Sequence, residues 1–324
     1  MDIFWGILIL EMLSLVSNKS QMLVKTKFSI KDLENLSGIK AHTIRIWEKR
    51  YGILKPSRTE TNIRAYHLES LKKLLNVSFL YQNGYKISKI AALDKKELKN
   101  LVAELAITKT EEHSIFNFKM AMFEFNQQLF AKTYNALLEE RTFPEVFQDI
   151  FIPLLTDLGI LWQTGTIDPC HERFISEMVK QKIVLNLESQ YHKNELKAPP
   201  TFALFLPYRE IHEIGLVYAN YLCVSHGVNT IYLGGNISFN SLKEVIKHHE
   251  DIQFLSYLTV EPSHQTIQDF CELYNATIGP NNKNELWLMG GKAKEAVNEN
   301  LPENIKLFTN IPQLTTALET LKKR

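Results

Sequence analysis

The sequence contains little cysteine, and its three cysteines lie far apart. Cys170, Cys223 and Cys271 form no CxxC pair, no zinc-ligand spacing and no even set for disulfides. This pattern is typical of thiols kept reduced in the cytoplasm, and it excludes a disulfide scaffold or a cysteine-rich zinc site. We therefore expect a cytoplasmic protein in which these residues act as small buried hydrophobic side chains.

The chain also lacks a charge excess, because its formal net charge is only +1 over 324 residues. The charges are nevertheless distributed unevenly. Residues 22–92 contain 14 Lys and Arg against 5 Asp and Glu, a net charge of +9, so the remainder carries −8. A basic segment on an acidic body predicts that this segment alone meets a polyanion.

The apolar run at residues 4–16 is too short to span a bilayer, and it is not typical of a signal peptide. Asp2 precedes it without any Lys or Arg, and Glu11 interrupts it. We hypothesise that translation starts at Met22 and that residues 1–24 form an extension outside the folded domains. Intact-mass analysis of the native protein tests this, and finding residues 1–21 in the mature chain would refute it.

Three regions follow this extension. Residues 25–95 are basic, with short helical patterns. Residues 110–190 show apolar positions at three-and-four spacing, as in 116–125 and 145–162, which predicts a helical bundle. A polar stretch ending in Pro199 and Pro200 reads as a linker to the region 200–324.

The last region alternates short apolar runs with helical stretches, which predicts a parallel Rossmann-like sheet with helices on both faces. Ligands in such folds bind at the carboxyl ends of the strands. The expected strands are 202–206, 230–233, 254–258, 286–289 and 305–308, and the expected helices are 210–225, 238–248, 263–274, 292–298 and 311–323.

The basic region has helix-turn-helix spacing. A helix over 31–37, with Ser29 as a possible N-cap, is followed by Gly38 and a second helix over 41–51. The second helix is the one expected in the major groove of DNA. An extended segment bearing Arg58 and Arg64 suits a wing that contacts backbone phosphates.

This region resembles the MerR family of winged helix-turn-helix regulators. The shared features are Thr-Ile-Arg-x-Trp-Glu at 43–48, Arg-Tyr-Gly at 50–52, Pro-x-Arg at 56–58 and Arg-x-Tyr at 64–66. For Trp47 we favour core packing, and for Tyr66 both packing and phosphate contact remain open. The expected contacts with double-stranded DNA are Thr43, Arg45, Lys49, Arg50, Arg58, Arg64 and Tyr66.

The MerR-type metal sensors carry ligand cysteines after a long dimerisation helix. Here no long heptad pattern follows Ala92, and the cysteines are placed differently. Both features argue against a metal sensor.

A histidine follows the first strand of the C-terminal region. A neutral imidazole at His212 can coordinate a metal, and Glu210, two residues earlier, can accept its other ring N–H. Gly215 then allows a bulky planar ligand to approach the backbone. By itself this pattern is weak, and an ordinary surface histidine would also fit it.

The downstream motifs strengthen the pattern. Ser-x-Leu at 256–258 ends the third strand, 41 residues after Gly215, and Gly290-Gly291 ends the fourth. Together, HxxG, SxL and GG resemble the cobalamin-binding domain of methionine synthase, mutases and corrinoid proteins. The resemblance implies that His212 is the lower cobalt ligand supported by Glu210, and that the nucleotide base of the cobalamin enters a slot bordered by Ser256, Leu258, Gly290 and Gly291.

The helical bundle adds a second resemblance, to the cap of the CarH-type cobalamin-dependent MerR photoreceptors. It implies that Trp162 covers the upper corrin face and that Glu172 contacts an adenosyl group, although Trp162 also suits a bundle core. Arg173 departs from the family, which carries the upper-ligand histidine at this position, and a guanidinium does not ligate cobalt. His171 lies about 200° away around a helix and would face elsewhere.

These observations predict a non-enzymatic, homo-oligomeric DNA-binding regulator whose affinity for DNA is set by cobalamin, in adenosyl or methyl form, bridging the cap and the Rossmann-like domain. Two alternatives remain. One is a regulator whose ligand-free, degenerate sensor serves oligomerisation. The other is a corrinoid methyl-transfer shuttle, against which the basic head argues.

Overall fold

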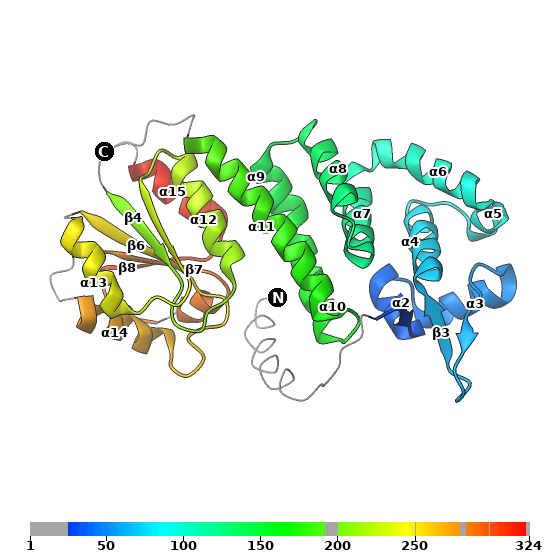
Figure 1. Ribbon diagram of the computed structural model, residues 1–324, viewed down its shortest axis with the longest axis horizontal. Helices are drawn as coiled ribbons and strands as arrows, with labels where there is room; N and C mark the ends of the chain where they lie inside the picture. The colour runs from blue at the N-terminus through cyan, green and yellow to red at the C-terminus, as the bar shows by residue number, and fades with distance from the viewer. Residues whose placement is uncertain (1–24, 192–199, 250, 279–282, 298, 322–324) are drawn as a thin grey trace. The chain divides into compact units, whose positions relative to one another are not determined.

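The computed structural model describes residues 25–191, 200–249, 251–278, 283–297 and 299–321 (Figure 1). The expected extension and most of the expected linker lie outside these residues. The chain divides into two compact units, one over Gln21–Met178 and one that includes Val179–Arg324. Among the described residues, no helix is both long and apolar enough to cross a membrane.

The first unit begins with the helix-turn-helix. Helix α2 (Ile30–Ser37) starts at a capping box in which Ser29 and Asp32 each bond the other's backbone N–H, and it ends at Gly38 in the left-handed conformation. Helix α3 (Ala41–Tyr51) then runs to Gly52, also left-handed. These bounds agree closely with the expected helices, because Ser29, Gly38 and Gly52 mark three of the four ends in the sequence.

A small antiparallel sheet completes this domain. Strand β3 (Arg64–His67) pairs with β1 (Lys27–Phe28) on one side and with β2 (Ser57–Arg58) on the other. The β2–β3 hairpin is the expected wing. Helix α4 (Leu68–Gln82) packs against α2 and β3, and the short α5 (Ile87–Ala92) follows.

Helix α6 (Lys95–Thr108) occupies a stretch for which the sequence analysis predicted no element. It starts at a capping box formed by Asp94 and Glu97. With only 14 residues, α6 is too short for the long dimerisation helix of a metal sensor. The expectation that this protein is not a metal sensor is therefore unchanged. The signal that we missed is this Asp-x-x-Glu cap.

The bundle contains α7 (Thr110–Glu124), α8 (Gln127–Leu138), α9 (Phe143–Glu145), α10 (Ile152–Gln163) and the long α11 (Pro169–Tyr191). A π-helical segment, η2 (Val146–Phe151), joins α9 to α10. Pro153 has no N–H to donate to the preceding turn, which explains why the regular helical ladder changes there. Aromatic rings fill the centre, with Phe118, Phe130 and Phe151 in mutual contact.

The second unit contains a five-stranded parallel sheet in the order β5-β4-β6-β7-β8. The strands are β4 (Thr201–Phe205), β5 (Thr230–Gly234), β6 (Ile252–Tyr257), β7 (Leu286–Met289) and β8 (Ile305–Phe308). The connections are α12 (Glu213–Ser225), α13 (Phe239–His248), α14 (Ile267–Ile278), the 3₁₀ helix η3 (Lys292–Ala296) and α15 (Ile311–Leu321).

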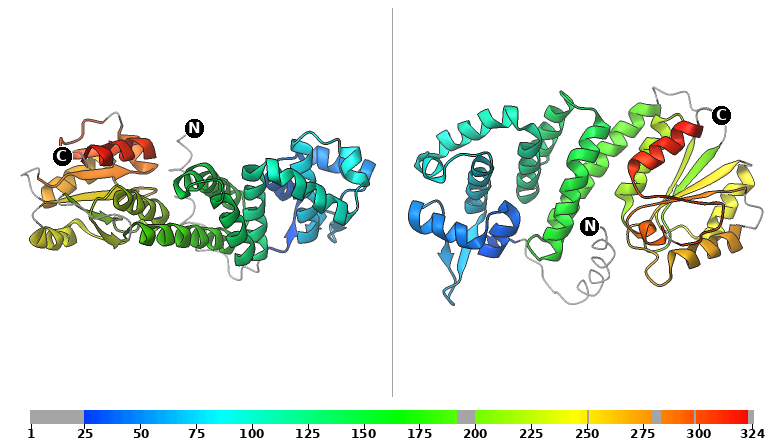
Figure 2. Two further views of the ribbon diagram at one scale, coloured as in Figure 1. Left: turned by 90° about the horizontal axis from the view of Figure 1, so that it is seen from above. Right: turned by 180° about the vertical axis from the view of Figure 1, so that it is seen from behind.

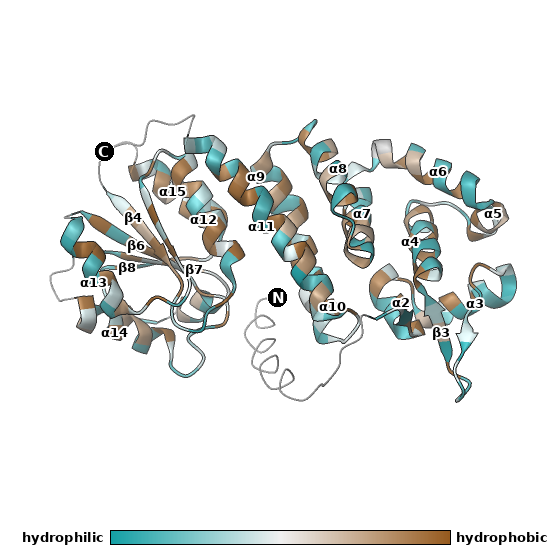
Figure 3. Ribbon diagram, in the orientation of Figure 1, coloured by the Kyte–Doolittle hydropathy of each residue, from teal (hydrophilic) through white to brown (hydrophobic). Residues whose placement is uncertain are grey.

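Both faces of this sheet are covered by helices, as the two further views show (Figure 2). The strands are predominantly apolar, whereas teal polar residues are frequent on the surrounding helices (Figure 3). The expected Rossmann-like fold is therefore confirmed, with two local corrections. The expected helix over 263–274 begins at Ile267, after a bend over residues 263–265, and the expected helix over 292–298 is a short 3₁₀ helix.

Candidate DNA-binding and ligand-binding sites

Exposed basic side chains line the second helix and the wing of the helix-turn-helix. Arg45, Lys49 and Arg50 are exposed on α3, and Thr43 is partly exposed on its first turns. Arg58 is exposed on the wing, where its Nη1 donates to the Asn62 side chain at 2.6 Å. These residues can reach an approaching duplex, so the structure leaves their predicted role open to test.

Two wing residues are held by one carboxylate of α3. Glu48 accepts a hydrogen bond from Arg64 Nε at 3.1 Å and another from the hydroxyl of Tyr66. Tyr66 is fully buried, and burial together with the bond to Glu48 raises its pKa. The inclusion of Tyr66 among the DNA contacts is therefore corrected to a packing role. Trp47 is 4% exposed and belongs to the core, as expected.

The helix-turn-helix region packs against the bundle inside the first unit, through α4 on α7 and at the turn between α10 and α11. Lys25 donates its backbone N–H to Asp168 and its ammonium group to the carbonyl of Gly165, at 2.8 Å from Nζ. Asn35 of α2 donates to the Thr166 hydroxyl at 2.9 Å. A conformational change at this turn would consequently alter the contacts of the DNA-binding domain directly.

Aromatic contacts extend the same interface. Phe28 of β1 meets the edge of Phe123 at a centroid distance of 5.4 Å, and His171 contacts Phe123 and stacks on Phe125. His171 is 1% exposed, and desolvation lowers its pKa. This burial fits the expectation that His171 faces away from an upper ligand site. Lys72 of α4 pairs with Glu69 and with Glu124 of α7.

The predicted upper-face residues lie in this first unit. Trp162 is half-buried near the end of α10, and Glu172, in the first turn of α11, accepts a 2.5 Å hydrogen bond from the Ser176 hydroxyl. Arg173 is exposed. Their roles toward a corrin remain predictions.

Sequence reasoning missed one cluster beside them. Ligand atoms of Asp168, Cys170 and His171 lie within 4.8 Å of one another. The Asp168 carboxylate and the His171 Nδ1 atom already accept backbone N–H groups, from Lys25 and Asp168 respectively, so the cluster serves the turn. Cys170 is exposed, which corrects the expectation that all three cysteines are buried.

The second unit brings the predicted lower-ligand residues together at the carboxyl ends of β4 and β6. In the strand order, β5 lies on one side of β4 and β6 lies on the other, so the order reverses between β4 and β6. Open α/β sheets bind ligands at such a reversal. Glu210 follows β4 and is 2% exposed. Its Oε2 atom accepts three backbone N–H groups after β6, those of Thr259, Val260 and Glu261, at 2.8–3.1 Å.

The other oxygen of Glu210 holds His212. Oε1 lies 2.5 Å from His212 Nδ1, which leaves Nε2 as the nitrogen available to a metal. Burial by itself would raise the pKa of Glu210, but the bonds from His212 and from the Val260 N–H outweigh it and lower the pKa to about 2. The expectation that Glu210 orients the histidine is confirmed in geometry.

The cobalamin resemblance implies four residues around the slot. Packing within the protein accounts for only some of them. Ser256 Oγ is fully buried and has no hydrogen-bond partner among the described residues, which fits a hydroxyl that bonds to a ligand. A Cβ at Gly290 would lie 2.2 Å from the Leu258 carbonyl oxygen, so Gly290 is required by backbone packing. Leu258 itself is buried in the sheet core, and Gly291 is partly exposed after β7.

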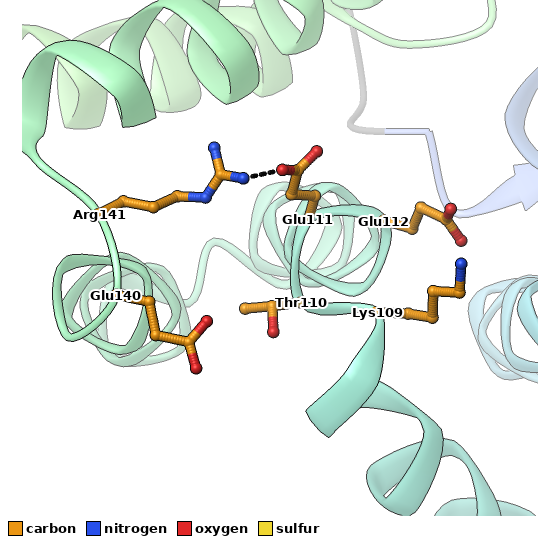
Figure 4. A pocket seen from close by; sticks show the side chains of 6 residues that line it. All are labelled: Lys109, Thr110, Glu111, Glu112, Glu140 and Arg141. Carbon is orange, nitrogen blue, oxygen red and sulfur yellow. Dashed lines mark hydrogen bonds and ion pairs between the residues drawn. The ribbon is translucent and has the colours of Figure 1, made fainter.

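The first unit also has a recess that is lined by none of the predicted site residues. Figure 4 shows that it is lined by Lys109, Thr110, Glu111, Glu112, Glu140 and Arg141. Arg141 is paired with Glu111 and Asp149, which neutralises its charge.

Two family models match parts of this chain, the helix-turn-helix region and the helical bundle. Residues 28–97 match the family model of the MerR HTH family regulatory protein, and residues 115–185 match that of the B12 binding domain. The chain carries a MerR-type DNA-binding domain and a B12-binding domain. The B12-binding match covers most of α7, the helices α8 to α10 and most of α11.

Two curated relatives match this chain over different lengths. The HTH-type transcriptional repressor CarH of Myxococcus xanthus is 28% identical over 218 residues, which cover 65% of this chain and 72% of CarH. The HTH-type transcriptional regulator MlrA of Escherichia coli K12 is 30% identical over 70 residues, 22% of this chain and 29% of MlrA. The latter match is confined to a segment the size of the MerR-type domain.

A solved structure shares the fold. The monomethylamine corrinoid protein of Methanosarcina barkeri superposes with a TM-score of 0.52 at 14% sequence identity, covering 64% of this chain and 99% of that protein. At this identity the likeness concerns the fold alone.

Proposed function

We propose that this protein is a transcription regulator whose DNA affinity depends on cobalamin. The observation that carries the proposal is the packing of a MerR-type domain against a B12-binding domain in one compact unit, through the α10–α11 turn. Glu172 lies one residue after His171 of that interface. A ligand contact at Glu172 would therefore be transmitted to the helix-turn-helix through few intervening residues.

The second unit supplies the donor set for a cobalt ion. His212, oriented by Glu210, would be the lower ligand through Nε2, and the unpartnered Ser256 hydroxyl would donate to a polar group of the ligand. When bound, cobalamin supplies a light- and redox-sensitive cobalt–carbon bond. We place Trp162 and Glu172 on the upper side of the ligand on the strength of the resemblance.

The DNA-binding role falls to the exposed basic residues of α3 and the wing. Each MerR-type domain would make several phosphate contacts. When one linked domain binds DNA, it raises the effective concentration of the next, so the DNA affinity rises steeply with the number of linked domains. Cobalamin would act on this number by altering how protomers associate. No catalytic turnover is part of the proposal.

The first experiment is an absorbance titration of the apo-protein with adenosylcobalamin in the dark. We expect the spectrum of a cobalamin whose own base is replaced by a protein histidine in the wild type, and its loss in His212→Ala. Glu319→Gln, an exposed carboxylate on α15, is the matched surface control. Absence of binding by the wild type would contradict the cobalamin assignment.

The second experiment tests coupling to DNA. A duplex selected by the protein from a random-sequence library is titrated with apo and cobalamin-loaded protein at fixed salt, with fluorescence anisotropy as the readout. We expect the two affinities to differ by about fivefold or more, the lower end of typical allosteric coupling. Equal affinities would show that cobalamin, even if bound, does not regulate DNA binding.

A further inference from the structure

The space over Gly215 is filled by an aromatic ring of the protein itself. Gly215 lies in the first turn of α12, three residues after His212. A Cβ placed on it would lie 2.3 Å from Tyr257 Cε1, 2.4 Å from Cδ1 and 2.5 Å from Cζ. Such distances mean that the Tyr257 ring rests directly on the glycine backbone, where no side chain would fit.

The position of this ring follows from strand geometry. Tyr257 is the last residue of β6, where alternate side chains point to opposite faces of the sheet. Phe254 and Leu258 point into the core that includes Leu242 and Phe270, from α13 and α14. Tyr257 consequently points to the other face, against α12.

The backbone around the ring is fixed on both sides. Glu210 ties the loop that carries His212 to the loop that follows β6, through its bonds to His212 and to residues 259–261. The Leu258 backbone is wedged against Gly290 and bonded to Met289 and Lys292. The Tyr257 side chain is therefore the group at this place that can move without a change of backbone.

We propose that the Tyr257 ring and the nucleotide base of a cobalamin compete for the space over Gly215, so that Tyr257 determines which corrinoid the site accepts. This inference rests on the proposed function, in which His212 is the lower cobalt ligand. A phenol ring and a benzimidazole are both flat aromatic groups, and two such groups cannot lie on the same glycine. A corrinoid without a nucleotide tail requires no displacement of the ring.

The test compares two ligands that differ in the tail. Hydroxocobalamin carries the nucleotide, whereas aquocobinamide has the same corrin ring without it. Absorbance titrations use the full chain as wild type, Tyr257→Ala, Tyr257→Phe and His212→Ala. Tyr257→Val is included as well, because a β-branched residue maintains strand propensity if alanine disturbs folding.

We expect Tyr257→Ala and Tyr257→Val to lower the Kd for hydroxocobalamin by about tenfold and to change the Kd for aquocobinamide by less than about twofold. Tyr257→Phe keeps the ring and should behave as the wild type. His212→Ala should weaken both ligands, which establishes the binding mode. Tyr191→Ala, an exposed tyrosine near the end of α11, is the matched control and should change neither.

The outcomes separate the two proposals. Binding of both ligands with a ratio of Kd values unchanged by removal of the ring would overturn the role of Tyr257 and leave the proposed function intact. Tighter binding of hydroxocobalamin by Tyr257→Ala and Tyr257→Val than by the wild type, with the Kd for aquocobinamide unchanged, would support the inference. Failure of both corrinoids to bind the wild type and every Tyr257 variant would overturn the proposed function, and the inference with it.

Discussion

The Glu210 carboxylate is expected to be a main source of stability for the second unit. Five hydrogen bonds reach it, three from backbone N–H groups of residues 259–261, one from the backbone of His212 and one from its ring. The difference between an ordinary pKa of 4.5 and one of about 2 corresponds to about 3 kcal/mol of stabilisation of the charged form. We predict that Glu210→Gln lowers the free energy of unfolding by about this amount at pH 7.

The sign of the pH dependence follows from the direction of the shift. Because folding lowers this pKa, the carboxylate contributes its full stabilisation above about pH 4.5 and loses it as the pH falls toward about 2. The difference between wild type and Glu210→Gln should therefore be constant near neutrality and shrink in acid. Glu210→Asp should also be destabilising, because the shorter side chain cannot reach both His212 and the three N–H groups.

Urea unfolding of the apo-protein between about pH 3 and pH 8, followed by circular dichroism, measures this difference. The exposed Glu319→Gln variant on α15 is the control and should match the wild type throughout. Equal stability of Glu210→Gln and wild type at pH 7, or a difference that does not shrink in acid, would refute the reasoning.

Three further predictions concern other parts of the chain. Arg45→Ala should weaken duplex binding by about tenfold and reduce its salt dependence, as measured by fluorescence anisotropy. The control Lys73→Ala on α4 should do neither, and equal losses in the two variants would contradict a specific role for α3. Gly290→Ala should lower the free energy of unfolding by more than about 2 kcal/mol, because the left-handed φ of 108° and the Leu258 carbonyl both oppose a Cβ; a neutral effect in urea unfolding would disprove this packing. Of the cysteines, Cys170 alone should react rapidly with a thiol reagent, since Cys223 and Cys271 are buried with pKa values raised to about 12; two or three fast thiols by mass spectrometry would be inconsistent with the fold.

The sequence predicted best those features that local chemistry determines. The helix-turn-helix bounds follow from Ser29, Gly38 and Gly52, residues whose capping preferences are strong. The five strands were expected within one or two residues at each end, because fully buried parallel strands are continuous apolar runs. The bond between Glu210 and His212 was expected because the two residues are close in the chain.

Contacts between residues far apart in the chain escaped the sequence analysis. The role of Tyr257 over Gly215 depends on the packing of α12 on β6, which no local pattern reveals. The same holds for Tyr66, whose burial depends on Glu48, and for His171, which completes an aromatic cluster with Phe123 and Phe125. Side-chain identity gave the chemistry of these residues, but tertiary packing decides whether they meet solvent, ligand or core.

The dual attachment of Glu48 restricts how the DNA specificity of this domain can be re-engineered. A recognition helix is usually retargeted by exchanging its residues for those of a relative with another operator. In this chain the same helix holds the base of the wing through Arg64 and Tyr66. A graft onto α3 that replaces Glu48 would release both anchors at once, so a library of altered-operator variants should keep this position fixed and randomise its exposed neighbours.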